Sequence, residues 1–114
     1  MPHFIIHCSA DILEPYSEEQ IIEQVHTVAR DSELFKERDI KVRLQPFTRY
    51  SAGNERLPFL HVFASIMQGR TDEQKSALSR AVVAKLLTLF PDTPNIAMNV
   101  SEFEKASYCN RDML

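Results

Sequence analysis

Glycine and cysteine are scarce in this 114-residue chain, which contains two of each, and tryptophan is absent. Two glycines are too few for a glycine-rich phosphate-binding loop. The two cysteines, Cys8 and Cys109, cannot form a cysteine-rich zinc site or a disulfide framework. Free thiols in a reducing compartment are the simplest interpretation, and a Cys8–Cys109 disulfide is the alternative.

Long apolar runs and an excess of basic residues are also missing. The longest apolar runs are only a few residues, whereas a membrane-spanning helix needs roughly 20. The first residues lack the cationic and apolar regions of a secretory signal, so we expect a cytoplasmic protein without membrane contacts. The net charge of −3 argues against a general nucleic-acid binder. It is compatible with a local basic pocket for an anionic small molecule.

The composition that is present, 44% hydrophobic and 25% charged, is typical of one globular domain. The core of so short a chain is modest, and oligomerisation would bury more surface. Strand patterns occur at residues 2–8, 40–45, 59–67 and 96–103. Two capping boxes, at residues 17–20 and 71–74, each predict the start of an amphipathic helix. The tail after residue 104 has no predicted element.

The predicted elements alternate as strand, helix, strand, and then repeat that order. This pattern indicates an α+β fold of two-layer tandem β-α-β units, with a four-stranded mixed sheet and two helices on one face. The halves, residues 1–56 and 57–114, begin alike, with Pro-His-Phe-Ile-Ile-His and Pro-Phe-Leu-His-Val-Phe, which makes a duplicated unit within a single domain plausible. Partner subunits are the expected cover for the other face of the sheet.

Pro2 is the first candidate for chemistry. Removal of Met1 would leave Pro2 as an amino-terminal secondary amine at the head of a buried strand. An α-amino group has a pKa of about 7.7–8.0, and both burial and nearby cations lower that pKa. A base with a pKa near neutrality is suited to taking a proton next to a carbonyl group. Many chains begin with Met-Pro for no catalytic reason, so this feature alone does not decide the question.

Three cationic residues are candidates for binding an anion. Arg70 lies just before a predicted helix N-terminus, where an arginine is unfavourable unless an anion binds there. Lys41 and Arg43 lie on one face of a strand because strand side chains alternate. Taken alone, each of the three is better explained as a solvated side chain. The four histidines, at positions 3, 7, 26 and 61, show no metal-ligand pattern, so we expect no metal site.

Taken together, these residues resemble a known family. The opening Met1-Pro2-His3-Phe4-Ile5-Ile6 with Cys8-Ser9, the segment Ile40-Lys41-Val42-Arg43, and the segment from His61 to Gly69-Arg70 are similar to 5-carboxymethyl-2-hydroxymuconate isomerases of the tautomerase superfamily. The similarity in element order covers nearly the whole chain, and the specific motifs are confined to these segments.

The resemblance implies a tautomerase-like fold and a homotrimer with active sites near the subunit boundaries. It also implies isomerisation, without metal or cofactor, of a small anionic substrate in the breakdown of aromatic compounds. That substrate is an unsaturated 2-hydroxy or 2-oxo acid with two or three carboxylates. Pro2 is then the general base, Arg70 is the catalytic residue that binds a carboxylate and stabilises the enolate, and Lys41 and Arg43 bind substrate.

Lys41 departs from the family pattern, which usually has arginine at this position. Lysine lacks the bidentate fork that arginine offers a carboxylate, although it can still act as a point charge. This departure leaves open a second hypothesis, a non-catalytic trimeric ligand-binding or interaction protein on the same scaffold.

Overall fold

Two β-α-β units follow one another along the chain in the computed structural model, which describes residues 1–114. The strands and helices are β1 (His3–Ser9), α1 (Glu18–Asp31), β2 (Lys41–Phe47), β3 (Phe59–Met67), α2 (Asp72–Leu89) and β4 (Asn95–Phe103). Short 3-10 helices occur at Ala10–Leu13, Glu37–Asp39 and Arg111–Met113. The last of these lies in the tail, where the sequence predicts no element.

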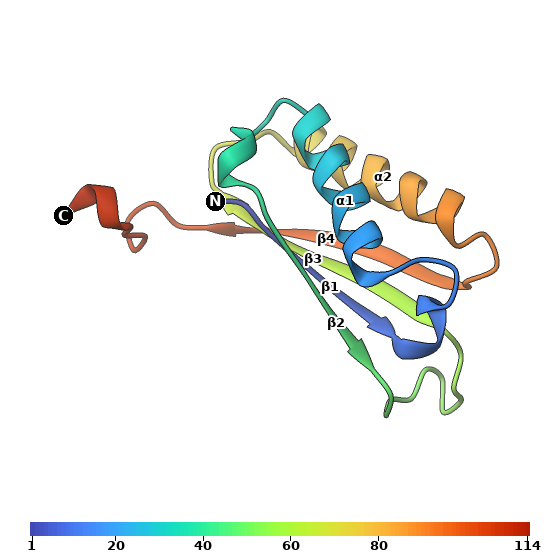
Figure 1. Ribbon diagram of the computed structural model, residues 1–114. Helices are drawn as coiled ribbons and strands as arrows, with labels where there is room; N and C mark the ends of the chain where they lie inside the picture. Colours follow the sequence, from blue (N-terminus) through green and yellow to red (C-terminus); the bar gives the residue numbers. More distant parts are fainter.

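The four strands form one mixed sheet in the order β2-β1-β3-β4. β1 is parallel to β2 and antiparallel to β3, and β3 is parallel to β4. Both helices cover the same face of this sheet, and the tail after β4 extends away from the body (Figure 1). The predicted two-layer architecture is confirmed.

The capping boxes begin both helices where the sequence predicts them. At α1 the Ser17 hydroxyl accepts a hydrogen bond from the Gln20 backbone at 3.2 Å, and the Gln20 side chain accepts one from the Ser17 backbone at 2.8 Å. Thr71 and Gln74 make the same reciprocal pair before α2, at 3.1 and 2.9 Å. These bonds satisfy backbone donors that would otherwise have no partner in the first helical turn.

The core lies between the sheet and the two helices. Alternate side chains of a strand point to the same face, so on β1 Phe4, Ile6 and Cys8 are fully buried under the helices. Burial raises the pKa of the Cys8 thiol to about 11, and nearby Glu18 and Asp11 add to the effect. Cys8 and the exposed Cys109 are both free thiols.

Other buried residues come from β3 and from one stripe of each helix. They are Leu60, Val62, Ala64 and Ile66 on β3, Ile21, Val25 and Ala29 on α1, and Leu78, Val82 and Leu86 on α2. The helix positions follow the spacing of three or four residues that an amphipathic helix requires.

β2 extends two residues beyond its predicted end and includes Pro46. A proline cannot donate a hydrogen bond to a sheet ladder, which makes it a signal for the end of a strand. β2 is an edge strand that pairs with β1 alone, so Pro46 is tolerated there.

Candidate active site

The ends of β1, β2 and β3 that carry the predicted site residues lie at the same end of the sheet. The N-terminal ends of the parallel strands β1 and β2 lie side by side, with His3 opposite Lys41. Because β3 is antiparallel to β1, the C-terminal end of β3 lies at the same place, with Ser65 opposite His3. The topology therefore brings Pro2 and Lys41 near the loop that carries Arg70.

A pocket of about 250 Å³ lies at this end of the sheet. Its lining residues are Met1, Leu34, Phe35, Lys36, Asp39, Met67 and Arg70. A larger hollow of about 480 Å³ lies between the two helices, but no predicted site residue lines it. The smaller pocket is therefore the one that adjoins the predicted site residues, since Arg70 and Met1, the neighbour of Pro2, line it.

Pro2 is fully buried at the head of β1. Its carbonyl accepts a hydrogen bond from the Lys41 backbone at 3.1 Å, which aligns the starts of β1 and β2. Met1 is attached to Pro2 in this structure and lines the pocket. The Pro2 nitrogen is therefore an amide here, and the terminal amine belongs to Met1.

The surroundings of the terminal amine favour its neutral form. The pKa of the Met1 amine is lowered, first by burial and then by a hydrogen bond to the Lys41 side chain and by the charge of Lys41. Asp39 acts in the opposite direction and raises the pKa of that amine. The pKa of His3 is also lowered, first by burial and then by Arg43, the chain terminus and Lys41.

Arg70 connects the loop after β3 with the segment after α1. Its Nη2 donates a hydrogen bond to the Leu34 carbonyl, and both residues line the pocket. The preceding Gly69 has a φ of 119°, a conformation that residues with a side chain rarely adopt. Glycine at this position allows the turn that directs the chain from β3 into α2.

The other two predicted cations lie at different depths along β2. Lys41 is at the start of the strand, where its Nζ donates to the Asp39 carbonyl at 2.9 Å. Arg43 is one pleat further along, with Nη1 3.1 Å from His3 Nδ1, and it does not line the pocket. Of the predicted site residues, only Arg70 lines the pocket. Pro2 and Lys41 adjoin it through two lining residues, Met1, which is bonded to Pro2, and Asp39, whose carbonyl accepts from Lys41, whereas Arg43 lies beside His3.

Lys36 and Asp39 line the pocket but were not among the residues that sequence analysis selected. They lie in the connection between α1 and β2, where neither periodicity nor a motif marks them. The topology of the fold could have identified these two residues. In a β-α-β unit the chain must return to the N-terminal end of the first strand before the second parallel strand begins. The residues just before β2 therefore lie next to Pro2.

The sheet face opposite the helices carries a band of aromatic and histidine rings. The His7 ring contacts Phe47 and Phe63 at centroid distances of 5.0 and 5.2 Å, and His61 lies 4.3 Å from Phe63. Phe63 is 41% exposed. No element of the chain covers this face, as Figure 1 shows.

Comparison with known proteins gives one family match and many similar structures. A sequence profile of the 5-carboxymethyl-2-hydroxymuconate isomerase family matches residues 2–111. No curated protein sequence matches the chain significantly. Neither helix has the length and hydropathy needed to cross a membrane.

Three solved structures illustrate the fold similarity. A 5-carboxymethyl-2-hydroxymuconate isomerase from Deinococcus radiodurans R1 is 21% identical in sequence and has a TM-score of 0.84. The superposition covers 96% of this chain and 88% of the isomerase chain. A fused 4-OT wild-type symmetric trimer is 14% identical and has a TM-score of 0.80, and the superposition covers 98% of this chain and 95% of the fused 4-OT chain. A macrophage migration inhibitory factor-like protein from Entamoeba histolytica is 16% identical and has a TM-score of 0.75, and the superposition covers 96% of this chain and 94% of the Entamoeba chain.

Proposed function

Because the chain belongs to the 5-carboxymethyl-2-hydroxymuconate isomerase family, we propose that it isomerises that compound or a similar unsaturated 2-hydroxy or 2-oxo acid with two or three carboxylates. One observation carries the proposal. The start of β1 adjoins a pocket with two lining cations, Lys36 and Arg70, and Lys41 lies beside the terminal amine. A neutral amine among cations suits proton transfer on an anionic substrate.

Removal of Met1 is the first requirement of this proposal. Met1 lines the pocket, so its loss enlarges the pocket and makes the Pro2 nitrogen a secondary amine beside it. The burial and the charge of Lys41 that lower the pKa of the Met1 amine also act at the start of β1, and both favour the neutral form of an amine there. At neutral pH the processed chain then has a base at the head of β1.

The proposed reaction moves one proton and needs no other reactant. The neutral Pro2 amine takes the proton of the 2-hydroxyl group of a dienol, and the electron pair of the O–H bond becomes that of an enolate. The ammonium of Pro2 then returns the proton to a carbon of the conjugated chain. The product is a 2-oxo isomer with the same atoms as the substrate.

The cations have separate roles in this scheme. Arg70 binds a carboxylate through its planar fork and stabilises the developing enolate charge. Lys41 binds substrate as a point charge next to the base. We assign Arg43 to substrate binding through its position beside His3, one pleat from Lys41.

An ultraviolet assay with a panel of 2-hydroxydienoates tests the proposal. Chain shown by mass spectrometry to lack Met1 should convert dienols to their 2-oxo isomers, and a substrate with a second carboxylate should react faster than one without. No turnover of any dienol by processed chain would favour the alternative, a non-catalytic ligand-binding protein. Lys41, in place of the usual arginine, is the observation that keeps this alternative in view.

The proposed assembly is a homotrimer in which the uncovered sheet face is buried, as fused 4-OT is a trimer with the same fold. We expect Phe63→Glu to convert the trimer to monomers in sedimentation velocity, because it places an unpaired charge in each interface. Leu87→Glu is the matched control, since Leu87 is similarly exposed, at 47%, but lies on α2 in the other layer. A wild-type monomer, or equal effects of the two variants, would contradict this assembly.

A further inference from the structure

Asp39 is the only carboxylate residue that lines the pocket beside Pro2. Its side chain is half-buried, in contrast to the exposed Lys36 and Arg70. The acidic residues that form ion pairs in the structure are Asp31, Glu37, Asp72 and Glu102, and Asp39 is not among them. The Asp39 carboxylate is therefore half-buried, has no ion-pair partner and lies beside an amine that we propose as a base. These three properties suggest that it acts on that amine.

The backbone holds Asp39 in place from both sides. Its N–H donates to the Lys36 carbonyl at 2.9 Å within the 3-10 turn, and its carbonyl accepts from Lys41 Nζ at 2.9 Å. The next residue, Ile40, is buried in the core. Asp39 is therefore fixed relative to the start of β2.

A second set of contacts attaches the same turn to α1. His26 Nε2 lies 2.8 Å from Glu37 Oε2, and Arg30 Nη1 lies 3.7 Å from the same oxygen. The hydrogen bond from His26 is the main reason that the pKa of Glu37 is lowered. The turn that carries Asp39 is thus held by the helix as well as by the sheet.

The charged groups around the terminal amine are otherwise positive. Lys41 comes from β2, Lys36 from the turn before it, Arg70 from the loop before α2, and His3, the other titratable neighbour, from β1. Helix α1 and strand β4 contribute no residue to the pocket. When the Pro2 amine takes a proton, it adds one more positive charge to this cluster of cations. Asp39 is the one negative charge among these neighbours that offsets the added charge.

We propose that Asp39 is a positioning residue whose carboxylate stabilises the ammonium form of Pro2 that proton abstraction creates. The proposal rests on the assignment of Pro2 as the base. Its physical reason is that a base surrounded only by cations holds a proton weakly and therefore abstracts one slowly. Asp39 acts on the substrate through Pro2 and does not itself take part in the reaction.

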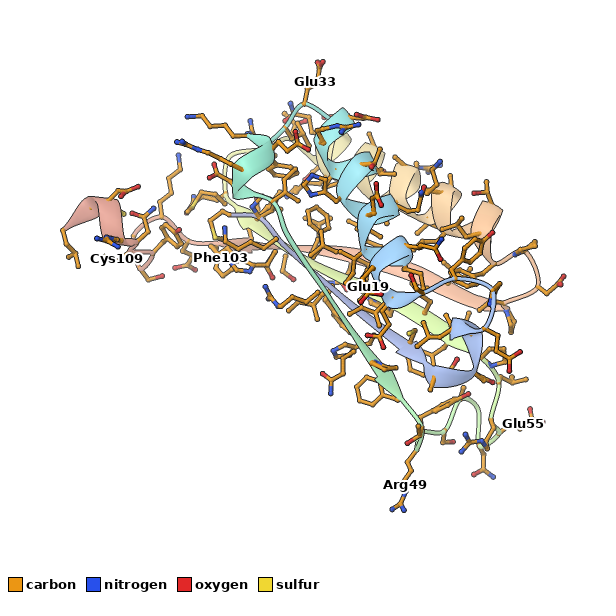
Figure 2. All side chains as sticks on the ribbon, viewed as in Figure 1. Glu19, Glu33, Arg49, Glu55, Phe103 and Cys109 are labelled. Carbon is orange, nitrogen blue, oxygen red and sulfur yellow. The ribbon has the colours of Figure 1, made fainter.

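The direct test is the titration of the Pro2 amine by ¹⁵N NMR, with proline-labelled chain from which Met1 has been removed. Asp39→Asn should lower the midpoint of this titration by about 0.5–1 pH unit, because an opposite charge raises the pKa of an amine. Asp39→Glu keeps the charge and should restore the midpoint. Glu33→Gln is the matched control, since Glu33 is exposed, has no ion pair and points away from the body (Figure 2).

The kinetic counterpart is the acid limb of the pH profile of kcat/KM. It should move to lower pH by the same amount in Asp39→Asn, while the rate on the alkaline plateau falls. An unchanged midpoint in Asp39→Asn, or an equal shift in Glu33→Gln, would overturn the proposal. The NMR titration needs no turnover, so it decides the role of Asp39 even if processed chain isomerises none of the dienols and the proposed function fails.

Discussion

Replacing Pro2 with alanine is expected to lower kcat/KM for a 2-hydroxydienoate by about 100-fold or more, since general bases contribute roughly 10²–10⁴-fold. Alanine is also compatible with removal of Met1, so the variant keeps a terminal amine at the same place. That amine is primary and less basic than proline, and it lacks the ring that fixes the nitrogen at the head of β1. The assay is the ultraviolet change on ketonisation, measured with chain verified by mass.

Pro58→Ala is the matched control for this variant. Pro58 precedes β3 as Pro2 precedes β1, but β3 is antiparallel to β1, so Pro58 lies at the other end of the sheet. Its replacement should leave kcat/KM unchanged. If Pro2→Ala and Pro58→Ala retain equal activity, Pro2 is not the base.

Replacing Arg70 with alanine is expected to lower kcat by about 10²–10³-fold, the usual effect of removing one donor to a developing oxyanion. Arg70→Lys should recover only part of the loss, because lysine keeps the charge but not the planar fork. The measurement is steady-state kinetics with separate kcat and KM. A rise in KM alone would assign Arg70 to substrate binding without a role in the transition state.

Arg49→Ala is the control for loss of one arginine. Arg49 follows the C-terminal end of β2 and lies at the far end of the sheet from the pocket (Figure 2). Arg70 also holds the Leu34 carbonyl, so thermal unfolding of each variant is needed to separate a catalytic effect from a loosened loop. Equal kinetics for the Arg70 and Arg49 variants would contradict the role given to Arg70.

The fold followed closely from local patterns in the sequence. The reciprocal Ser17–Gln20 and Thr71–Gln74 bonds are encoded within four residues each, and they begin the helices as predicted. β3 has its predicted limits because its alternation is strong and Gly69 follows it. Pro46 shows where such patterns fail, since tolerance of proline depends on the edge position of β2, which only the sheet order reveals.

The site was predictable only in part, because it is assembled from distant segments. Pro2 and Arg70 carried local signals, an amino-terminal proline and an arginine before a helix. Lys36 and Asp39 carried none, because their proximity to Pro2 comes from the return of the chain to the start of β1. The distinction between Lys41 and Arg43 also needed the structure, since both lie on one strand face and only their depth along β2 separates them.

The central claim is that the Pro2 nitrogen, released by removal of Met1, is the catalytic base. Its most direct test compares two preparations of the same chain, one without Met1 and one with Met1 retained, each verified by mass spectrometry. Retained Met1 makes the Pro2 nitrogen a non-basic amide, so we predict rapid ketonisation of a 2-hydroxydienoate by the processed chain and none above background by the other. Equal rates for the two preparations would contradict the claim.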